Sequence, residues 1–432
     1  MRQKLPIDKF TGPVSKFIHQ EHTSGIVLFI SVLAAIVWVN SPFAHSYHQV
    51  WDIKISLGFG GYVLDHPLHL WINDGLMAVF FFVIGLELKR EFMAGELSTL
   101  KKASLPMVAA LGGMLVPALI YFFINKGTDA EHGWGIPMAT DIAFALALLS
   151  IAGKQIPSSV KVFLSALAVA DDLGAVLVIA IFYSSHIALV PLTIGVWLLV
   201  ILLIGNKLGI RSIVFYLVIG FAVWVAFLLS GVHATIAGVL VAFTIPARTR
   251  INEKSYAESL KKLLFDFEKQ IPNNSTLTTS EQHHTIEKIK ELSMDAETPL
   301  QKVEYALHPW VAFVVMPLFA LANAGIIIGA DFFTSLLNPV SMGVAIGLLA
   351  GKFIGVLLAT WLMVKFGAQL PAKASWKQIT GVALLAGVGF TMSLFISGLA
   401  FTHPQMVDQA KYGILLASLL AGILGVVVLK KS

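Results

Sequence analysis

The sequence predicts an all-α membrane protein with about twelve transmembrane helices. The chain has 432 residues, of which 57% are hydrophobic and 13% are charged, whereas soluble proteins are roughly 25% charged. The apolar residues gather in runs of the length that crosses a bilayer, about 20 residues. Ionisable side chains interrupt several of these runs, and two runs carry glycine and polar residues at mid-span. We therefore expect one polytopic transmembrane domain over residues 1–432.

Composition also excludes several classes of protein. No cysteine occurs in the chain, which rules out a disulfide framework, a thiolate nucleophile and cysteine-ligated metal sites. The sequence contains no glycine-rich phosphate loop and no metal-ligand spacing, so a primary pump is not expected. We expect no enzymatic activity, no resident cofactor and no nucleic-acid partner.

The apolar runs define the expected spans and their order. The N-terminal "MRQKLPIDKFTGPVSKFIHQEHT" is polar and has no cleavage site after it, so we read it as a retained cytoplasmic segment. Twelve runs follow, at residues 24–40, 69–88, 104–124, 136–152, 157–183, 189–206, 211–229, 231–247, 307–328, 340–364, 377–401 and 411–429.

When the N-terminus is placed in the cytoplasm, lysine and arginine concentrate in the loops on the cytoplasmic side. The outside loops then carry only Lys54, Lys126 and Lys411. Of all 30 lysines and arginines, Lys352 alone fits neither side, because it lies at the centre of span ten, in "VAIGLLAGKFIGVLLATWL"; apart from the three outside lysines, the others fall on the inside. By the positive-inside rule, both termini are expected in the cytoplasm.

Two segments lie outside the spans. In residues 41–68 the stretch "IKISLGFGGYVLD" alternates around glycines, which predicts a small extracytoplasmic β-hairpin. The hairpin is either a plain surface loop or an edge for contact with a second copy. Residues 248–303 form a charged cytoplasmic insert, in which "SYAESLKKLLFDFEKQI" and "TIEKIKEL" have helical spacing around a polar linker. We expect a solvated helical hairpin there.

Seven ionisable side chains fall within the expected spans. A charged side chain at the centre of a membrane helix costs roughly 2.5–3.5 kcal/mol on insertion scales, and such residues mark ion paths. A structural ion pair could account for Lys352 with one aspartate. It cannot account for the excess of core acids, which needs a cation or a proton. The seven are Asp74, Glu87, Asp141, Asp171, Asp172, His233 and Lys352.

The adjacent acids in "ALAVADDLGAVLVIA" cannot share one partner. Neighbours on a helix point about 100° apart, so one of Asp171 and Asp172 can pair with Lys352 while the other stays free. Desolvation and a neighbouring carboxylate both disfavour the ionised form. The free carboxylate is thus suited to hold a proton or a hard cation in turn, and oxygen ligands select hard cations.

Two spans predict discontinuous helices. Span four, "GWGIPMATDIAFALALLSIAG", places the N-cap signature Thr140–Asp141 at membrane depth. Span eleven, "GVALLAGVGFTMSLFISGLAF", has Gly387 and Gly389 at its centre. The two spans run in opposite directions, as crossing broken helices in an inverted-repeat transporter would. Asp141 would then compensate facing helix N-termini, and Lys352 facing C-termini.

The motifs resemble those of a known family. "ATDIAFALALLS", "ALAVADDLGAVLVIA", "SGVHATIAGVLVAFTIP", "LHPWVAFVVMPLFALANAG", "GLLAGKFIGV" and "GVGFTMSLFISGLAF" together are similar to the bacterial NhaA-type Na⁺/H⁺ antiporters. The likeness runs from about residue 12 to the C-terminus, apart from the insert. That family is itself one of the known examples of inverted repeats with broken helices.

The resemblance implies a role for each core residue. It implies that Asp172 is the primary site for Na⁺ or Li⁺ and for the proton, and that Asp171 pairs with Lys352 and also exchanges protons. Thr140 and Asp141 would lie at the crossing, and Asp74 near the ion site.

The resemblance also implies a pH-regulating cluster near the cytoplasm, while a homodimer is expected through the 41–68 hairpin. "GLELKRE" supplies Glu87 and Glu91, and "VEYALHPW" supplies Glu304 and His308; His233 in "SGVHAT" would also respond to pH. Simpler readings remain open: interface charges for the glutamates, a carbonyl partner for His233 and a helix start at His308. Tyr305 and the long insert depart from the family pattern, which bears on the pH set-point.

The expected function is pH-regulated, electrogenic export of Na⁺ in exchange for protons by alternating access. An ion-coupled symporter of a small organic solute on a similar scaffold is the alternative, although no arginine lies mid-membrane to bind a carboxylate. An intramembrane aspartyl protease is disfavoured because "AVADD" lacks its glycine frame. A passive channel is disfavoured because the charged pair would hold ions too tightly.

Overall fold

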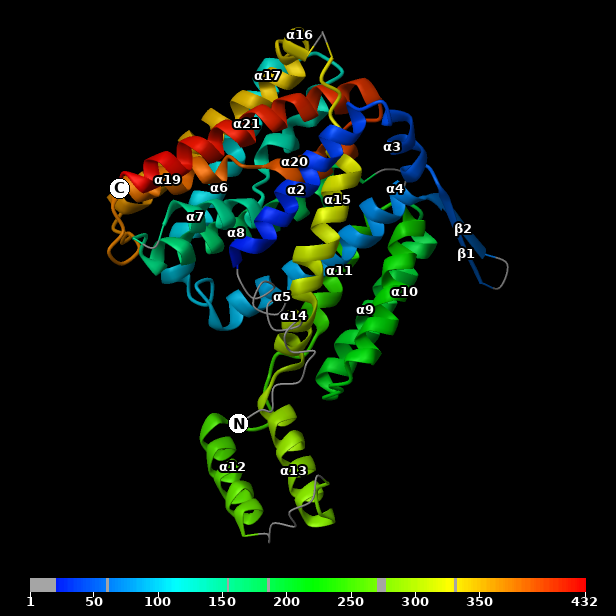
Figure 1. Cartoon of the computed structure of the whole chain (residues 1–432), viewed down its shortest axis with the longest axis vertical. Coiled ribbons are helices and arrows are strands. Elements are labelled where there is room, and N and C mark those ends of the chain that lie inside the picture. Colours follow the sequence, from blue (N-terminus) through cyan, green and yellow to red (C-terminus); the bar gives the residue numbers. More distant parts are fainter. Residues whose placement is uncertain (1–20, 60–61, 154, 185–186, 270–276, 330–331) are drawn as a thin grey trace.

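The computed structural model describes residues 21–59, 62–153, 155–184, 187–269, 277–329 and 332–432. Helices dominate, and they gather into one bundle from which two hairpins project (Figure 1). The N-terminal segment that is expected in the cytoplasm falls largely on residues 1–20, which lie outside the described residues. Lys154, which is expected on the inside, also lies outside them.

Within the described residues, the N-terminal half contains two strands and ten α-helices, together with one π-helix and one 3-10 helix. Its elements are α2 (Glu21–Val39), α3 (Ala44–Trp51), β1 (Lys54–Phe59), β2 (Tyr62–Pro67), α4 (Leu68–Leu70), the π-helical η1 (Trp71–Leu76), α5 (Met77–Ala94), α6 (Leu100–Asn125), the 3-10 helix η2 (Glu131–Met138), α7 (Ile142–Ala152), α8 (Ser158–Phe182), α9 (Leu189–Lys207), α10 (Ile213–Ser230) and α11 (Ala234–Thr244).

The C-terminal half begins with the insert and returns to the bundle. Its elements are α12 (Glu253–Glu268), α13 (Ser280–Ala296), α14 (Pro299–Trp310), the π-helical η3 (Val311–Val315), α15 (Met316–Asn323), α16 (Phe332–Leu336), α17 (Pro339–Ile346), the π-helical η4 (Gly347–Gly351), α18 (Lys352–Lys365), α19 (Trp376–Ala386), α20 (Phe390–Ala400) and α21 (Pro404–Lys430).

The number of spans differs from the expected twelve. Within the described residues, ten helices are long and apolar enough to cross a membrane, and an eleventh is counted if α2 and α3, bent by 117°, are one span. The remaining candidate, α11, has 11 residues and is about 16 Å long, roughly half the hydrocarbon thickness. The expected span 231–247 is longer than α11 because residues 231–233 and 245–247 at its two ends are mostly apolar but not helical.

Two pairs of helices pack with their backbones in close contact. A Cβ atom added to Gly355 of α18 would lie 2.1 Å from the carbonyl oxygen of Gly112 in α6, and one added to Gly238 of α11 would lie 2.3 Å from that of Ala78 in α5. Small residues at membrane helix interfaces permit this approach. Separate apolar clusters surround the two pairs, one on α6, α8, α18 and α19 and the other on α5, α10 and α11.

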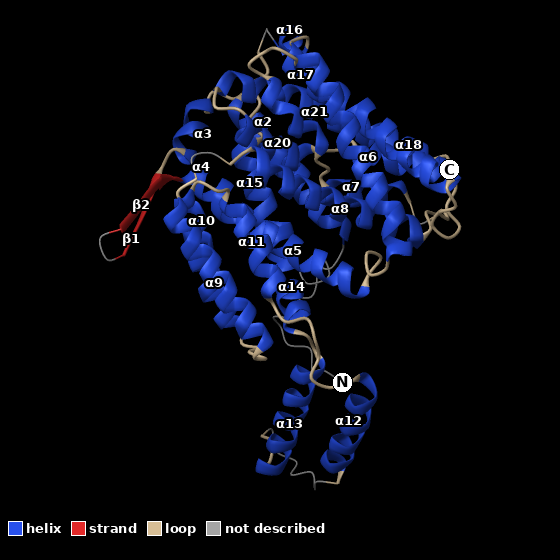
Figure 2. Ribbon diagram, turned by 180° about the vertical axis from the view of Figure 1, so that it is seen from behind, coloured by secondary structure: helices blue, strands red, loops and turns tan. Residues whose placement is uncertain are grey.

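Both hairpins stand outside the bundle. Strands β1 and β2 pair antiparallel, with Lys54 opposite Pro67 and Phe59 opposite Tyr62, and they project beside α3 and α4 (Figure 2). Helices α12 and α13 extend from the end of the bundle at which α14 begins (Figure 1). Helix α12 has no buried residue, so this second hairpin is held by few apolar contacts.

Candidate ion-binding site

The two broken helices contact each other at their interruptions. One break, at residues 139–141, separates η2 from α7, and the other, at residues 387–389, separates α19 from α20. The backbone N–H of Asp141 donates to the carbonyl of Val388 at 2.7 Å. Thr140 Oγ1 donates to the carbonyl of Ala386 at 2.8 Å. Groups at each break are thus hydrogen-bonded to the other break. Surroundings of low polarity require such bonds, because no water is present to satisfy exposed backbone groups.

Asp141 lies between two helix N-termini. Its Oδ1 accepts from the N–H of Phe144, at 3.1 Å, and so caps α7. Its Oδ2 accepts from the N–H of Thr391 at 3.0 Å and from the hydroxyl of the same residue, in the first turn of α20. A carboxylate at a helix N-terminus compensates the partial positive charge there, and this geometry confirms the expected compensation for Asp141. The corresponding expectation for Lys352 and helix C-termini remains untested.

Lys352 and Asp171 form an ion pair with no access to water. The Nζ–Oδ2 distance is 2.5 Å, and both side chains have 0% exposure. Lys352 follows directly after η4, a π-helical turn of the kind that is frequent at functional sites. The pairing assigned to Asp171 by its motif is therefore present.

Asp172 is buried next to the Asp171–Lys352 pair. The residue is 1% exposed, and its Oδ1 has no hydrogen bond within the described part of the chain. The charges that act on it are the carboxylates of Asp171, Asp141 and Glu87 and the ammonium of Lys352. Asp141 and Asp171 are also 1% exposed and Lys352 is 0% exposed, so three buried acids face one buried base.

This imbalance defines the chemistry that the site can perform. An isolated buried carboxylate is strongly disfavoured unless a proton, a cation or hydrogen bonds compensate its charge. Asp141 has its hydrogen bonds and Asp171 has an ion pair at its Oδ2. Among the described residues, the buried Oδ1 atoms of Asp171 and Asp172 have no hydrogen bond. These two oxygens are therefore available to a small hard cation or to a proton.

The four residues of the expected pH-regulating cluster lie where α5 meets α14; they are Glu87, Glu91, Glu304 and His308. Arg90 Nη1 forms an ion pair with Glu304 Oε1, and Arg90 Nη2 forms one with Glu91 Oε1 at 3.3 Å. Glu304 is 2% exposed, and the charges of Glu87 and His308 act on it. His308 lies in the last turn of α14, so the reading of it as a helix start is wrong: the helix begins nine residues earlier, at Pro299, because Thr298 caps it there.

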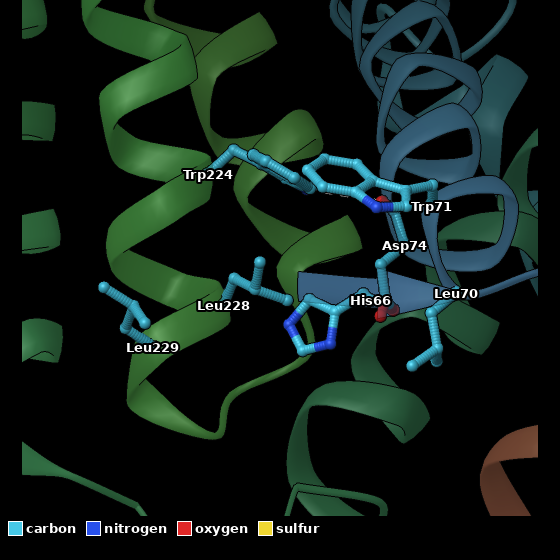
Figure 3. A pocket seen from close by; sticks show the side chains of 7 residues that line it. All are labelled: His66, Leu70, Trp71, Asp74, Trp224, Leu228 and Leu229. Atoms are coloured by element: carbon cyan, nitrogen blue, oxygen red, sulfur yellow. Dashed lines mark hydrogen bonds between the residues drawn. The ribbon is translucent and has the colours of Figure 1, made fainter. Parts of the chain in front are cut away.

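Asp74 and His233 form a third group, which lies near the β-hairpin. The charges of His233, His66 and His69 act on the Asp74 carboxylate. His233 Nε2 is 2.7 Å from the carbonyl of Tyr183, so the simple expectation of a carbonyl partner for this histidine is correct. Asp74 lines two cavities, one of about 340 Å³ (Figure 3) and one of about 690 Å³.

Sequence reasoning missed two partners in these clusters. Thr391, which binds Asp141, lies two residues beyond Gly389 in the broken span, and this spacing was the available signal. Arg90 lies in "GLELKRE", of which only the two glutamates are predicted as site residues. No local pattern links it to Glu304, which lies 214 positions away.

The fold and these side chains define the class of the molecule. It is a polytopic helical membrane protein in which two discontinuous helices meet at a cluster of buried, unbalanced charges.

Comparison with known proteins identifies the family. The model of the family "Na+/H+ antiporter 1" matches residues 15–429, and the chain belongs to that family. The Na(+)/H(+) antiporter NhaA of Oleidesulfovibrio alaskensis is 48% identical over 427 residues, which covers 98% of this chain and 95% of that protein. The Na(+)/H(+) antiporter NhaA 2 of Syntrophotalea carbinolica is 47% identical, with 97% and 96% covered. These matches confirm the family resemblance.

A solved structure is also similar. The sodium proton antiporter of Methanocaldococcus jannaschii aligns with 94% of this chain and 90% of its own at 15% identity and a TM-score of 0.44.

Proposed function

We propose that this protein exchanges Na⁺ or Li⁺ for protons across the bacterial inner membrane, with Asp172 and Asp171 as the shared cation and proton site. One observation carries the proposal: among the described residues, the buried Oδ1 atoms of Asp172 and Asp171 have no hydrogen bond, while Asp171 Oδ2 pairs with Lys352. The names of the relatives support the choice of ions.

The exchange follows from competition for one carboxylate. When the site opens to the outside, protons bind the aspartates and displace Na⁺ outward. When the site opens to the cytoplasm, Na⁺ displaces the protons. Coupling arises because neither state leaves the buried negative charge uncompensated. If more protons than Na⁺ move in each cycle, the membrane potential drives the exchange with about 2.3 kcal/mol per net charge per 100 mV.

Alternating access is supported by the division of the bundle. The aspartates and Lys352 belong to α8 and α18, in the group packed around α6, while α5 and α11 form the other close pair. We propose that one group rocks against the other and that the crossing moves as a unit, held by the bonds of Thr140 and Asp141 across the two breaks.

Sidedness is supported by a basic cavity. Lys89, Lys207, Arg211, Arg248 and Arg250 line one cavity of about 600 Å³ where α9 and α11 end. These residues come from three stretches that the positive-inside rule assigns to the cytoplasm. We propose cytoplasmic termini, a cytoplasmic α12–α13 insert and an extracytoplasmic β-hairpin that joins two copies into a homodimer, with Ile53 and Ile55 exposed at 55% and 38%.

Transport by the purified protein tests the proposal. In proteoliposomes, we expect Na⁺ and Li⁺ gradients to move protons in the opposite direction, with K⁺ inactive at matched concentration across several pH values. A pH-sensitive dye inside the vesicles measures the proton movement. Co-directional movement of Na⁺ and protons with an organic solute would instead establish the symporter alternative.

We propose that the cluster of Glu87, Glu91, Glu304 and His308 sets the pH dependence, with a further contribution from His233. Arg90→Gln removes the ion-pair partner of the buried Glu304. We expect the pH of half-maximal exchange to move by about one unit or more, because one unit corresponds to only about 1.4 kcal/mol between protonation states. The measurement is the rate of Na⁺-induced proton movement across pH.

Lys102→Gln is the matched control for this prediction. Lys102 pairs with Glu96 at 4.0 Å with both side chains exposed, and such surface pairs contribute about 0–1 kcal/mol. Its pH profile should stay that of the wild type. An unshifted profile for Arg90→Gln would mean that the cluster only holds α5 against α14.

A further inference from the structure

Asp74 lines two cavities, and the β-hairpin borders the smaller one. The larger cavity contains Asp74, His69 and His233 and has the Asp408–Lys411 pair at its edge, with Nζ–Oδ1 at 3.2 Å. The smaller cavity, of about 340 Å³, contains the same aspartate with His66 from β2. Figure 3 shows the His66 ring and the Asp74 carboxylate within this smaller cavity.

The β-hairpin holds the His66 side chain on the face of β2 that borders the smaller cavity. Trp71 Nε1 in η1 donates to the carbonyl of Ile55 at 3.1 Å, and Ile55 is the register partner of His66. Successive side chains of a strand point to opposite faces. The neighbouring Asp65 is exposed and accepts from Ser56 Oγ at 2.5 Å, so it occupies the face away from the cavity.

Asp74 is suited to exchange protons with this imidazole. Within the described residues, Trp224 Nε1 donates to the carbonyl of Asp74 at 3.2 Å and not to its carboxylate. The charges acting on that carboxylate come from His233 of the α11 cap, His66 of β2 and His69 of α4. Of these three, His233 is bound to the carbonyl of Tyr183.

The larger cavity is lined by Asp74 and also by residues of α20, the helix that begins at one of the two breaks. These α20 residues include Leu394 and Phe395. Leu394 lies three residues beyond Thr391, the partner of Asp141, which is a rise of about 4.5 Å along the helix. A proton on Asp74 is therefore held at the wall of a cavity that reaches to within one helical turn of the site.

We propose that His66 transfers protons between the outside solution and Asp74 through the smaller cavity, so that the β-hairpin forms part of the proton entrance. The N–H bond of the His66 imidazolium breaks, the proton binds a carboxylate oxygen of Asp74, and the neutral imidazole takes a new proton from buffer or water. Reversal of these steps releases a proton. The inference rests on the proposed antiport and adds the route by which its protons arrive.

Chemical rescue tests the proposal. Proteoliposomes loaded with ²²Na⁺ are held at one pH on both sides in weak buffer, and Na⁺ efflux is measured. We expect His66→Ala to slow efflux several-fold, short of the about 10²-fold that a positioned proton-transfer group can contribute, because water in the cavity still carries protons. Added 4-methylimidazole, which is small enough for the cavity, should restore the rate. The same buffering capacity supplied as a bulky sulfonate buffer should not.

Controls separate this inference from the antiport itself. His45→Ala removes an exposed histidine of α3 that contacts Gln49, and we expect the wild-type rate with no response to 4-methylimidazole. In an Asp74→Asn background, adding His66→Ala should cause no further loss. A His66→Ala rate equal to that of the wild type, or a loss that 4-methylimidazole does not restore, would overturn the proton entrance while leaving exchange intact. If the wild-type protein showed no exchange of Na⁺ for protons, the proposed function itself would be overturned.

Discussion

Asp172→Asn is expected to abolish Na⁺-induced proton movement in everted membrane vesicles. Asparagine keeps the shape of the side chain in a position that is 1% exposed, but it can neither bind a proton near neutral pH nor carry the charge that binds Na⁺. Removing one member of a buried charge pair costs about 3–5 kcal/mol, which corresponds to about 10²–10⁴-fold weaker binding of the cation. Exchange should fall by at least that factor.

Two comparisons make this result specific. Asp266→Asn removes one negative charge from the exposed face of α12 and should leave the rate unchanged. Isothermal titration of purified Asp172→Asn should detect no heat of Na⁺ binding, while its thermal stability stays equal to or above that of the wild type, since no buried hydrogen bond to Oδ1 is lost. Normal proton movement by Asp172→Asn would contradict the assignment of this carboxylate as the ion site.

The core of the site could be predicted because membrane burial makes charged residues conspicuous. Asp171, Asp172 and Lys352 lie in otherwise apolar runs, and the high cost of such charges permits few explanations. Helix geometry alone required that only one of the two aspartates pair with Lys352. The structure has this arrangement, and the motif had indicated which aspartate it is.

The breaks in spans four and eleven could be located for a similar reason, but their contacts could not. Gly389 and the Thr140–Asp141 step are local signals of an interrupted helix. The bonds that join the breaks link residues about 250 positions apart, and only the packed fold brings them together. The length of α11 was overestimated because apolar composition does not distinguish a helix from the extended residues that flank it.

The surroundings of Asp74 show what a motif leaves out. The resemblance implies a place near the ion site, which stays a prediction, while the structure places Asp74 in the π-helical η1 among three histidines, two of which, His66 and His69, belong to the hairpin and to α4. Nothing in the local sequence indicates that the hairpin folds back onto η1. The bond from Trp71 to Ile55 achieves this, and it depends on the strand register.

Lys352→Ala is expected to destabilise the protein more than it changes the preference among cations. The substitution leaves Asp171 fully buried without its partner, and breaking a buried ion pair in this way costs about 3–5 kcal/mol. The methylene groups of Lys352 also contact the tightly packed α6 near Gly113, so a cavity adds to the loss. Thermal unfolding in detergent, followed by intrinsic fluorescence, measures the decrease in stability.

The double variant distinguishes the lost ion pair from the lost packing. Lys352→Ala with Asp171→Asn removes both charges, so it should recover part of the stability lost by Lys352→Ala alone, because no unpaired charge remains buried. The ratio of Na⁺- to Li⁺-induced proton movement in any residual exchange should stay near that of the wild type. If stability were unchanged while this ratio shifted, Lys352 would be acting on the bound ion directly, and its role as the counter-charge of Asp171 would have to be abandoned.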